Sequence, residues 1–138
     1  MFDHCLYFNT TALARVLERE WSAAFQTFDL SPSQAFLLRT VLDSPGLAQR
    51  ELAASMVISR STATRALDGL ARKGLIERRA SGRDGREQFI YPTRRARSLR
   101  TALNDASGRV TRRLKKLLGE DVFVDTVGKV RDARTALN

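Results

Sequence analysis

The stretch SRSTATRALDGLARKGLIERRASGRDGREQFIYPTRRARSLR, residues 59–100, decides the fold of this 138-residue chain. It holds 12 of the 24 Lys and Arg but only 4 of the 15 Asp and Glu, so its net charge is +8, against +9 for the whole chain. Its first part has the apolar spacing of a helix, and its second part alternates as the strands of a hairpin do. A helix and a hairpin that carry clustered arginines are suited to bind a polyanionic duplex.

The first part of this stretch predicts a helix from Ser59 to about Lys73. Ser59 is a suitable N-cap, and Gly74 is a suitable residue to end the helix. The residues expected to face inward are Ala63, Ala66, Leu67 and Leu70. A short helix over about 48–55 precedes this one across a brief connection, and two helices joined this tightly predict a helix-turn-helix.

The second part predicts a β-hairpin. Leu75–Arg79 and Glu87–Tyr91 alternate between apolar and polar residues, and residues 81–85 between them contain two glycines. Glycine supplies the positive φ angles that a tight reversal needs. Pro92 is expected to end the second strand.

Further apolar stripes at helical spacing flank this unit on both sides. We expect a first helix over about 9–28, with Leu13, Leu17, Trp21 and Phe25 on one face. A second helix is expected over about 32–42, with Ser31 as its N-cap and Pro32 in its first turn. After residue 94 two more amphipathic helices are expected, interrupted at Gly119-Glu120.

The flanking helices predict a homodimer. A lobe of about 60 residues has little spare surface on which to bury several extra apolar stripes, so we expect these stripes to pack on each other and on a second copy of the chain. We therefore expect one domain over 1–138, with a helix-turn-helix and hairpin lobe over about 30–93 and a dimerisation layer over about 6–29 and 94–138. The predicted fold class is mainly α with a small β-hairpin. A monomeric helical bundle remains an alternative.

Composition sets the class of protein. The sequence pI of about 10.9 indicates an acidic partner, either nucleic acid or an anionic membrane surface. No apolar run approaches the roughly 18 residues that would span a bilayer, and the first residues lack the pattern of a signal peptide. The single cysteine, Cys5, cannot form an internal disulfide, so we expect a cytoplasmic protein.

The outward face of the predicted helix supplies most of the expected DNA contacts. Its N-terminal turns are expected to enter the major groove, where Arg65 would fork onto a guanine edge. Arg60 and Arg72 are expected on phosphates, which position the protein without reading sequence. The expected DNA-binding set is Ser59, Arg60, Ser61, Thr62, Thr64, Arg65 and Arg72 from the helix, and Arg83 and Arg86 from the hairpin. A solvated polar helix face is the alternative.

The hairpin tip has its own expected roles. Arg83 or Arg86 would enter a narrow minor groove, whose negative potential attracts an inserted arginine. Phosphates would repel Asp84, so we expect it to hold the hairpin's shape by pairing with Arg78, Arg79 or Arg86. An ordinary turn aspartate that bonds its own backbone is compatible with this role.

Several segments together resemble the MarR family of winged helix-turn-helix transcriptional regulators. Residues 30–38 (LSPSQAFLL) resemble the start of the family's second helix, and residues 45–53 (PGLAQRELA) resemble the start of its helix-turn-helix. Residues 61–70 (STATRALDGL), followed by 73–76 (KGLI), resemble its recognition helix and exit. Asp84-Gly85-Arg86 matches the family's Asp-x-Arg in the wing. The order and spacing of these segments carry the resemblance over nearly the whole chain. After the wing, Thr93 is followed by Arg94-Arg95-Ala96, where the family often has Thr-x-x-Gly.

The resemblance implies a homodimer on a pseudo-palindromic operator in double-stranded DNA, usually acting as a repressor. In some members a small aromatic or phenolic ligand relieves repression, bound between the dimer layer and the DNA-binding lobe. Phe8, Trp21, Phe25 and Phe36 are candidates to line such a pocket, although aromatic residues at helical spacing also form ordinary cores. For a carboxylate on the ligand, Arg15, Arg39 and Arg50 all remain candidates.

Other functions are weighed against this one. Some regulators of this kind sense peroxides through a cysteine near the first helix, so Cys5 is a candidate redox residue; its alternative role is to pack in the dimer layer. A winged-helix module for protein or RNA contacts also remains open. We expect no enzyme, cofactor or metal site, because one His and one Cys make a poor catalytic pair and the chain lacks a Gly-rich phosphate loop and metal-ligand spacing. The apolar stripes are explained by packing, so no membrane partner is expected.

Overall fold

The computed structural model describes residues 1–82 and 86–138. Six α-helices and a three-stranded antiparallel sheet make up this part of the chain: α1 (Leu6–Phe25), α2 (Pro32–Asp43), β1 (Leu47–Ala48), α3 (Gln49–Met56), α4 (Arg60–Arg72), β2 (Ile76–Ala80), β3 (Gln88–Pro92), α5 (Arg94–Leu118) and α6 (Glu120–Leu137). A 3₁₀ turn, η1 (Gln26–Phe28), follows α1. The predicted fold class, mainly helical with a small sheet, is confirmed.

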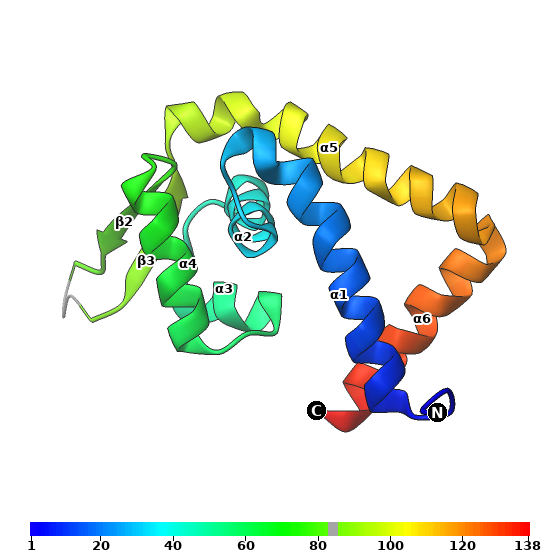
Figure 1. The fold of residues 1–138 in the computed structure, drawn as a ribbon. Coiled ribbons are helices and arrows are strands. Elements are labelled where there is room, and N and C mark those ends of the chain that lie inside the picture. Colours follow the sequence, from blue (N-terminus) through cyan, green and yellow to red (C-terminus); the bar gives the residue numbers. More distant parts are fainter. Residues whose placement is uncertain (83–85) are drawn as a thin grey trace.

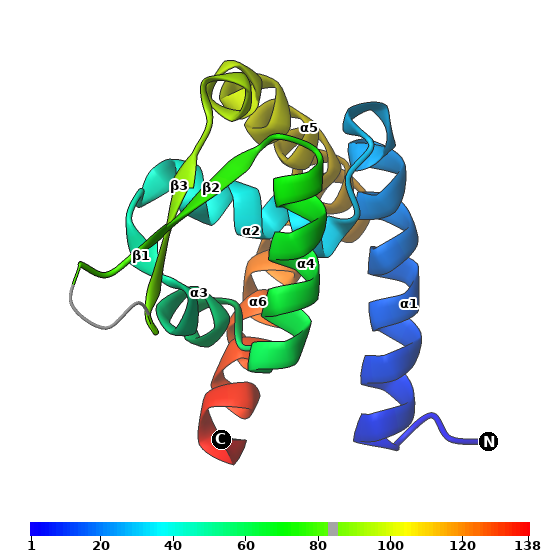
Figure 2. The ribbon, with the colours of Figure 1, turned by 90° about the vertical axis from the view of Figure 1, so that its left-hand side faces the viewer.

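The helices and strands are arranged as a compact lobe with long helical arms (Figure 1). α2, α3, α4 and the sheet form the lobe, and α5 leads away from it toward α6. α1 and α6 extend to the end of the molecule where both termini lie, as the second view also shows (Figure 2). No described helix is long and apolar enough to cross a membrane.

The core of the lobe is made by the residues that the apolar spacing predicted. Leu67 and Leu70 of α4 are fully buried, together with Leu37 and Leu38 of α2. Leu103 of α5 joins the same cluster, so the first half of α5 is packed on the lobe. The second half of α5 leaves the core, and its Leu117 is largely exposed.

Helix ends follow local chemistry. Ser31 caps α2 with a full capping box, in which its Oγ accepts from the Gln34 backbone and the Gln34 side chain accepts from the Ser31 backbone N–H. Thr93 caps α5 with a single bond, in which its Oγ1 accepts from the Ala96 N–H. Gly74 follows α4 with φ +71°, a left-handed conformation that glycine adopts without a steric penalty.

Two boundaries differ from the sequence prediction. The expected first helix, about 9–28, begins earlier, at Leu6, and becomes a 3₁₀ turn after Phe25. The Asn9 side chain lies within the helix and donates to the carbonyl oxygens of Asp3 and Cys5. The sheet also has a third strand, β1, in which Leu47 pairs with Ile90. Two residues are too few to show the alternation that predicts a strand.

Candidate nucleic-acid interface

The predicted recognition helix is α4. Ser59 caps it by accepting from the Thr62 N–H at 3.1 Å, and its Oγ also bonds the hydroxyls of Ser61 and Thr62. These short hydroxyl contacts define the start of the helix, and therefore the direction in which its first turn presents side chains. Ser59, Arg60, Ser61, Thr64, Arg65 and Arg72 are exposed, while Thr62 is half-buried. The outward face predicted from the sequence is thus available to a partner along most of its length.

The wing lies beside this helix. β2 and β3 pair antiparallel over five residues each, from Ile76 opposite Pro92 to Ala80 opposite Gln88. Arg86 precedes β3 and is exposed. Arg83 and Asp84, the other two residues that the sequence assigned to the wing tip, lie outside the residues that the structure describes.

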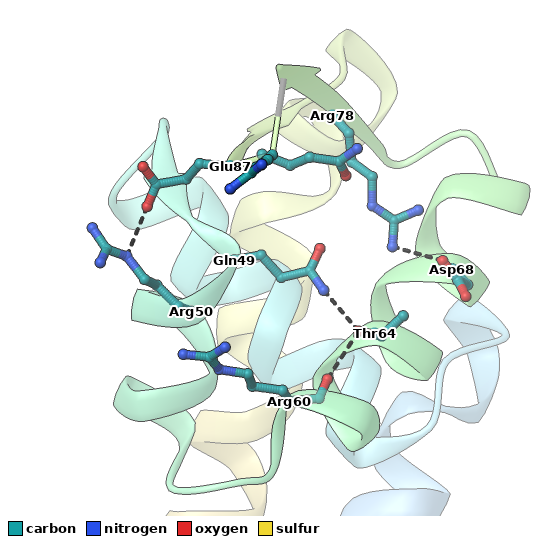
Figure 3. Close-up of a pocket in the computed structure, with 9 residues that line it drawn as sticks. Gln49, Arg50, Arg60, Thr64, Asp68, Arg78 and Glu87 are labelled. Atoms are coloured by element: carbon teal, nitrogen blue, oxygen red, sulfur yellow. Dashed lines mark hydrogen bonds and ion pairs between the residues drawn. The ribbon is translucent and has the colours of Figure 1, made fainter. Parts of the chain in front are cut away.

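A polar hollow of about 570 Å³ opens between α3, α4 and the wing (Figure 3). Its lining contains four arginines and two carboxylates, so it is cationic; the residues are Gln49, Arg50, Arg60, Thr64, Asp68, Arg78, Arg86, Glu87 and Gln88. A surface with a net positive charge attracts a polyanionic partner. The hollow therefore joins the two elements that carry the predicted DNA contacts into one cationic face.

Two ion pairs fix the elements around this hollow to one another. Arg78 of β2 donates to Asp68 of α4 at 2.6 Å, with the Arg78 side chain only 23% exposed. Arg50 of α3 donates to Glu87, just before β3, at 2.7 Å. The wing is thus tied to both helices of the helix-turn-helix (Figure 3). The carboxylate that Arg78 contacts is that of Asp68. Asp84 lies outside the described residues, so its expected pairing with Arg78, Arg79 or Arg86 stays a prediction.

The remaining arginines of α4 are not neutralised. Within the described residues, Arg60, Arg65 and Arg72 make no ion pair with a carboxylate, and all three are exposed. Arg78 pairs with Asp68 and Arg50 pairs with Glu87, so these two arginines fix the wing against α4 and α3. Residue spacing alone does not show which arginines pair with carboxylates of the protein and which remain available to a partner.

Sequence analysis missed several residues of this face. Gln49, the first residue of α3, donates from Nε2 to the Thr64 hydroxyl at 2.8 Å, and Thr64 itself donates to the Arg60 carbonyl oxygen at 2.9 Å. Arg50 and Glu87 were likewise not assigned to the face. The available signal was the position of Gln49 and Arg50 at the start of the first helix of a helix-turn-helix, which approaches the backbone of bound DNA.

A second region of interest lies between α1 and α2. Trp21 and Phe36 line a mostly apolar hollow of about 390 Å³, together with Ala14, Leu17, Glu18, Pro32, Ser33 and Met56. The expectation that Phe25 lines the same pocket is wrong: Phe25 is fully buried in the core, where its ring meets Phe36 edge-on. Phe8 is also absent from the lining.

Arg39 joins the long helices to the lobe. Its guanidinium donates to Asn104 at 2.8 Å and to Ser107 at 3.0 Å, both on α5, and lies over the Phe36 ring. Burial lowers the pKa of Arg39 below its ordinary value. Trp21 of α1 donates to the same Ser107 hydroxyl at 3.2 Å. One hydroxyl therefore connects α1, α2 and α5.

Two further predictions concern the candidate redox residue Cys5 and metal sites. Cys5 is an exposed free thiol immediately before α1. Among the described residues, no cluster of three or more His, Cys, Asp or Glu side chains is arranged to hold a metal ion.

Comparison with known proteins agrees with this geometry. The MarR family model matches residues 28–87, which span α2, the helix-turn-helix and the first wing strand, β2, and end just before β3. The chain is 26% identical over 87 residues to the "Uncharacterized HTH-type transcriptional regulator YybA" of Bacillus subtilis (strain 168), covering 63% of this chain and 58% of that protein. The chain spans little more than half the length of the curated relatives it matches.

Solved structures match over nearly the whole fold. The chain superposes on the S. aureus MepR–DNA complex with a TM-score of 0.84, at 19% identity, covering 95% of this chain and 97% of that one. For the transcriptional regulator SlyA the TM-score is 0.83 at 20% identity, covering 96% and 94%. The predicted resemblance to the MarR family and the winged helix-turn-helix fold are both confirmed.

Proposed function

We propose that this MarR-like chain is a homodimeric transcriptional repressor that binds a pseudo-palindromic operator in double-stranded DNA in the cytoplasm. The observation that carries the proposal is the cationic face built from α4, the hollow and the wing. On this face three exposed arginines of one helix have no carboxylate partner within residues 1–82 and 86–138, while Asp68 and Glu87 pair with arginines of the wing and α3. Such a face suits the phosphate-lined major groove better than an uncharged partner.

The proposed roles of the helix residues follow from their places on α4. Arg65 and the short hydroxyl side chains of Ser61 and Thr62 lie in the N-terminal turns, which enter the groove most deeply in helix-turn-helix proteins. Arg65 would then fork onto a guanine edge, and Arg60 and Arg72, nearer the two ends of the helix, would contact phosphates. Arg86 and Arg83 would serve the wing in the minor groove.

The exposed apolar side chains of α1 and α6 support the homodimer. They form two sets outside the core: Leu6, Tyr7, Phe8, Leu13 and Val16 on α1, and Val122, Val124, Val127, Val130 and Leu137 on α6. Large apolar side chains exposed in numbers on one helix are typical of an interaction site. Both helices extend to the same end of the molecule, away from the wing (Figure 1). A two-fold axis through these helices would set two copies of α4 toward successive major grooves.

The hollow beside Trp21 and Phe36 supports a small aromatic or phenolic effector. Its lining is mostly apolar and its volume of about 390 Å³ lies within the usual range of small-molecule sites. It contacts α1 on one side and α2 on the other, so an occupant would change the packing between the proposed dimer layer and the lobe. In this proposal the effector weakens operator binding by altering the spacing of the two lobes.

Selection of bound duplexes from random DNA tests the proposal. We expect an inverted repeat whose half-sites lie about one helical turn apart. Arg65→Ala should relax sequence choice at one position of each half-site, whereas Arg72→Ala should weaken all duplexes about equally. A stable monomer that is indifferent to every duplex at low ionic strength would refute the proposal.

A further inference from the structure

The Thr64 side chain does not have the hydrogen-bonding capacity that its outward position suggests. Its hydroxyl proton is used on the Arg60 carbonyl oxygen, and one lone pair accepts from Gln49. A hydroxyl in this state cannot donate to a base or to a phosphate. Beside it, the amide of Gln49 keeps unused capacity in the hollow.

The Gln49 amide has both a donor and an acceptor available. One of its two Nε2 protons is used on Thr64, which leaves the second proton. Its Oε1 has no hydrogen-bond partner among the residues that the structure describes, and in Figure 3 this oxygen points away from Thr64. A donor and an acceptor side by side on one amide complement the N7 acceptor and the N6 donor of adenine.

Thr64 restrains this amide. Gln49 comes from α3 and Thr64 from α4, so their 2.8 Å bond crosses between the two helices of the helix-turn-helix. Glutamine has several rotatable bonds, and ordering it at a DNA interface costs free energy. A bond that already holds the amide in the free protein reduces this cost.

We propose that Gln49 reads an adenine in the major groove, and that Thr64 is a positioning residue that holds the Gln49 amide in place. This inference rests on the proposed function, because it needs α4 to lie in the groove of an operator. It assigns base recognition to α3, in addition to the contacts of Arg65 on α4. Arg60 and Arg86 line the same hollow, so they would place positive charge near the phosphates that flank this base.

The inference is tested by repeating the duplex selection with the full-length chain and its variants. Gln49→Ala should lose the preference for adenine at one position of each half-site and keep the rest of the selected sequence. Its affinity for the wild-type operator should fall by about 5- to 150-fold per half-site, the usual value of one bidentate base contact. Gln49→Glu should move the preference at that position toward cytosine, whose N4 amine donates to a carboxylate. Gln26→Ala, an exposed glutamine on η1 outside the hollow, is the matched control and should change nothing.

Variants of Thr64 separate positioning from packing. Thr64→Val keeps the shape but removes the hydroxyl, and should weaken the adenine preference without abolishing binding. Thr64→Ser keeps the hydroxyl and should restore the preference. If Gln49→Ala still selects the wild-type sequence, or if its affinity falls by the same factor for every duplex, the inference is wrong and the proposed function stands. If the wild-type chain selects no sequence, both are wrong.

Discussion

Breaking the pair between Asp68 and Arg78 should destabilise the lobe measurably. The perturbation is Asp68→Ala, which removes the carboxylate that Arg78 contacts at 2.6 Å. The Arg78 side chain is 23% exposed, and its Nε is buried and lacks a partner within the described residues even with Asp68 present. Removing Asp68 therefore leaves a mostly buried guanidinium without a carboxylate.

The size of the effect follows from this burial. A hydrogen bond to a charged group contributes about 1.5–3 kcal/mol, and an exposed ion pair contributes about 0.2–1 kcal/mol. Asp68 is 43% exposed, so we take about 2 kcal/mol for the pair. Alanine is a better helix former than aspartate by roughly 0.5 kcal/mol, which reduces the net loss to about 1.5 kcal/mol. At roughly 2.1 cal/mol/K of unfolding entropy per residue, this lowers the Tm of a chain of this length by about 5 °C.

The assay is thermal unfolding followed by circular dichroism, at matched protein concentration because dimerisation also raises the Tm. Glu77→Ala is the matched control, since Glu77 pairs with Arg79 on the same wing at 3.5 Å and both side chains are more than half exposed. It should change the free energy of unfolding by less than about 0.5 kcal/mol. In the Asp68→Ala background, Arg78→Met should recover most of the loss, because it removes the orphaned charge and keeps the apolar stem. A Tm of Asp68→Ala equal to that of Glu77→Ala would refute the reasoning.

Three more predictions concern DNA, the dimer and the turn before α3. Operator affinity should fall with salt with a log–log slope of about −3.6 or steeper, since Arg60 and Arg72 of two protomers would make four phosphate contacts. A flat salt dependence in fluorescence anisotropy would contradict these phosphate contacts. Val127→Asp should weaken dimerisation about 100-fold or more in sedimentation, because each interface would bury two carboxylates, whereas Lys129→Ala on the polar side of α6 should leave it intact. Gly46→Ala should cost about 1–2 kcal/mol, because Gly46 has φ +89° and its new Cβ would lie 3.1 Å from the Tyr91 hydroxyl oxygen. Gly82→Ala, with open space around it, should be near neutral in the same denaturant titration.

The spacing of apolar residues predicted the helices of this fold, because one face of each helix must be buried in the core. Ala63, Leu67 and Leu70 are each fully buried on α4, as the spacing of apolar residues indicated. Capping chemistry predicted the starts of α2 and α4, since Ser31 and Ser59 both make the expected bonds to backbone N–H groups. The start of α1 was not predicted because Cys5 is its N-cap without a side-chain hydrogen bond, so no residue type marks the boundary.

Pairing between distant segments was less predictable. In the sequence Arg78 was considered only as a partner of Asp84, but its carboxylate partner in the structure is Asp68, ten residues earlier on α4. Arg50 and Glu87 are separated by 37 residues, and only the packing of α3 against the sheet brings them within 2.7 Å. Charge counts give the sign of a surface, whereas the division into engaged and available charges depends on tertiary contacts.

The case of Thr64 shows why facing outward differs from being available. A helical wheel places Thr64 on the outer face of α4, and the structure leaves it exposed. The wheel cannot show that a threonine in a helix can donate to the carbonyl four residues earlier, as Thr64 does to Arg60. It also cannot show that a side chain from another helix donates to the Thr64 hydroxyl oxygen, as Gln49 does. Hydrogen-bonding capacity is limited per atom, so each bond made within the protein subtracts from what a base can use. The residues that read a sequence are therefore better sought among exposed polar groups with unused donors and acceptors than among exposed residues as such.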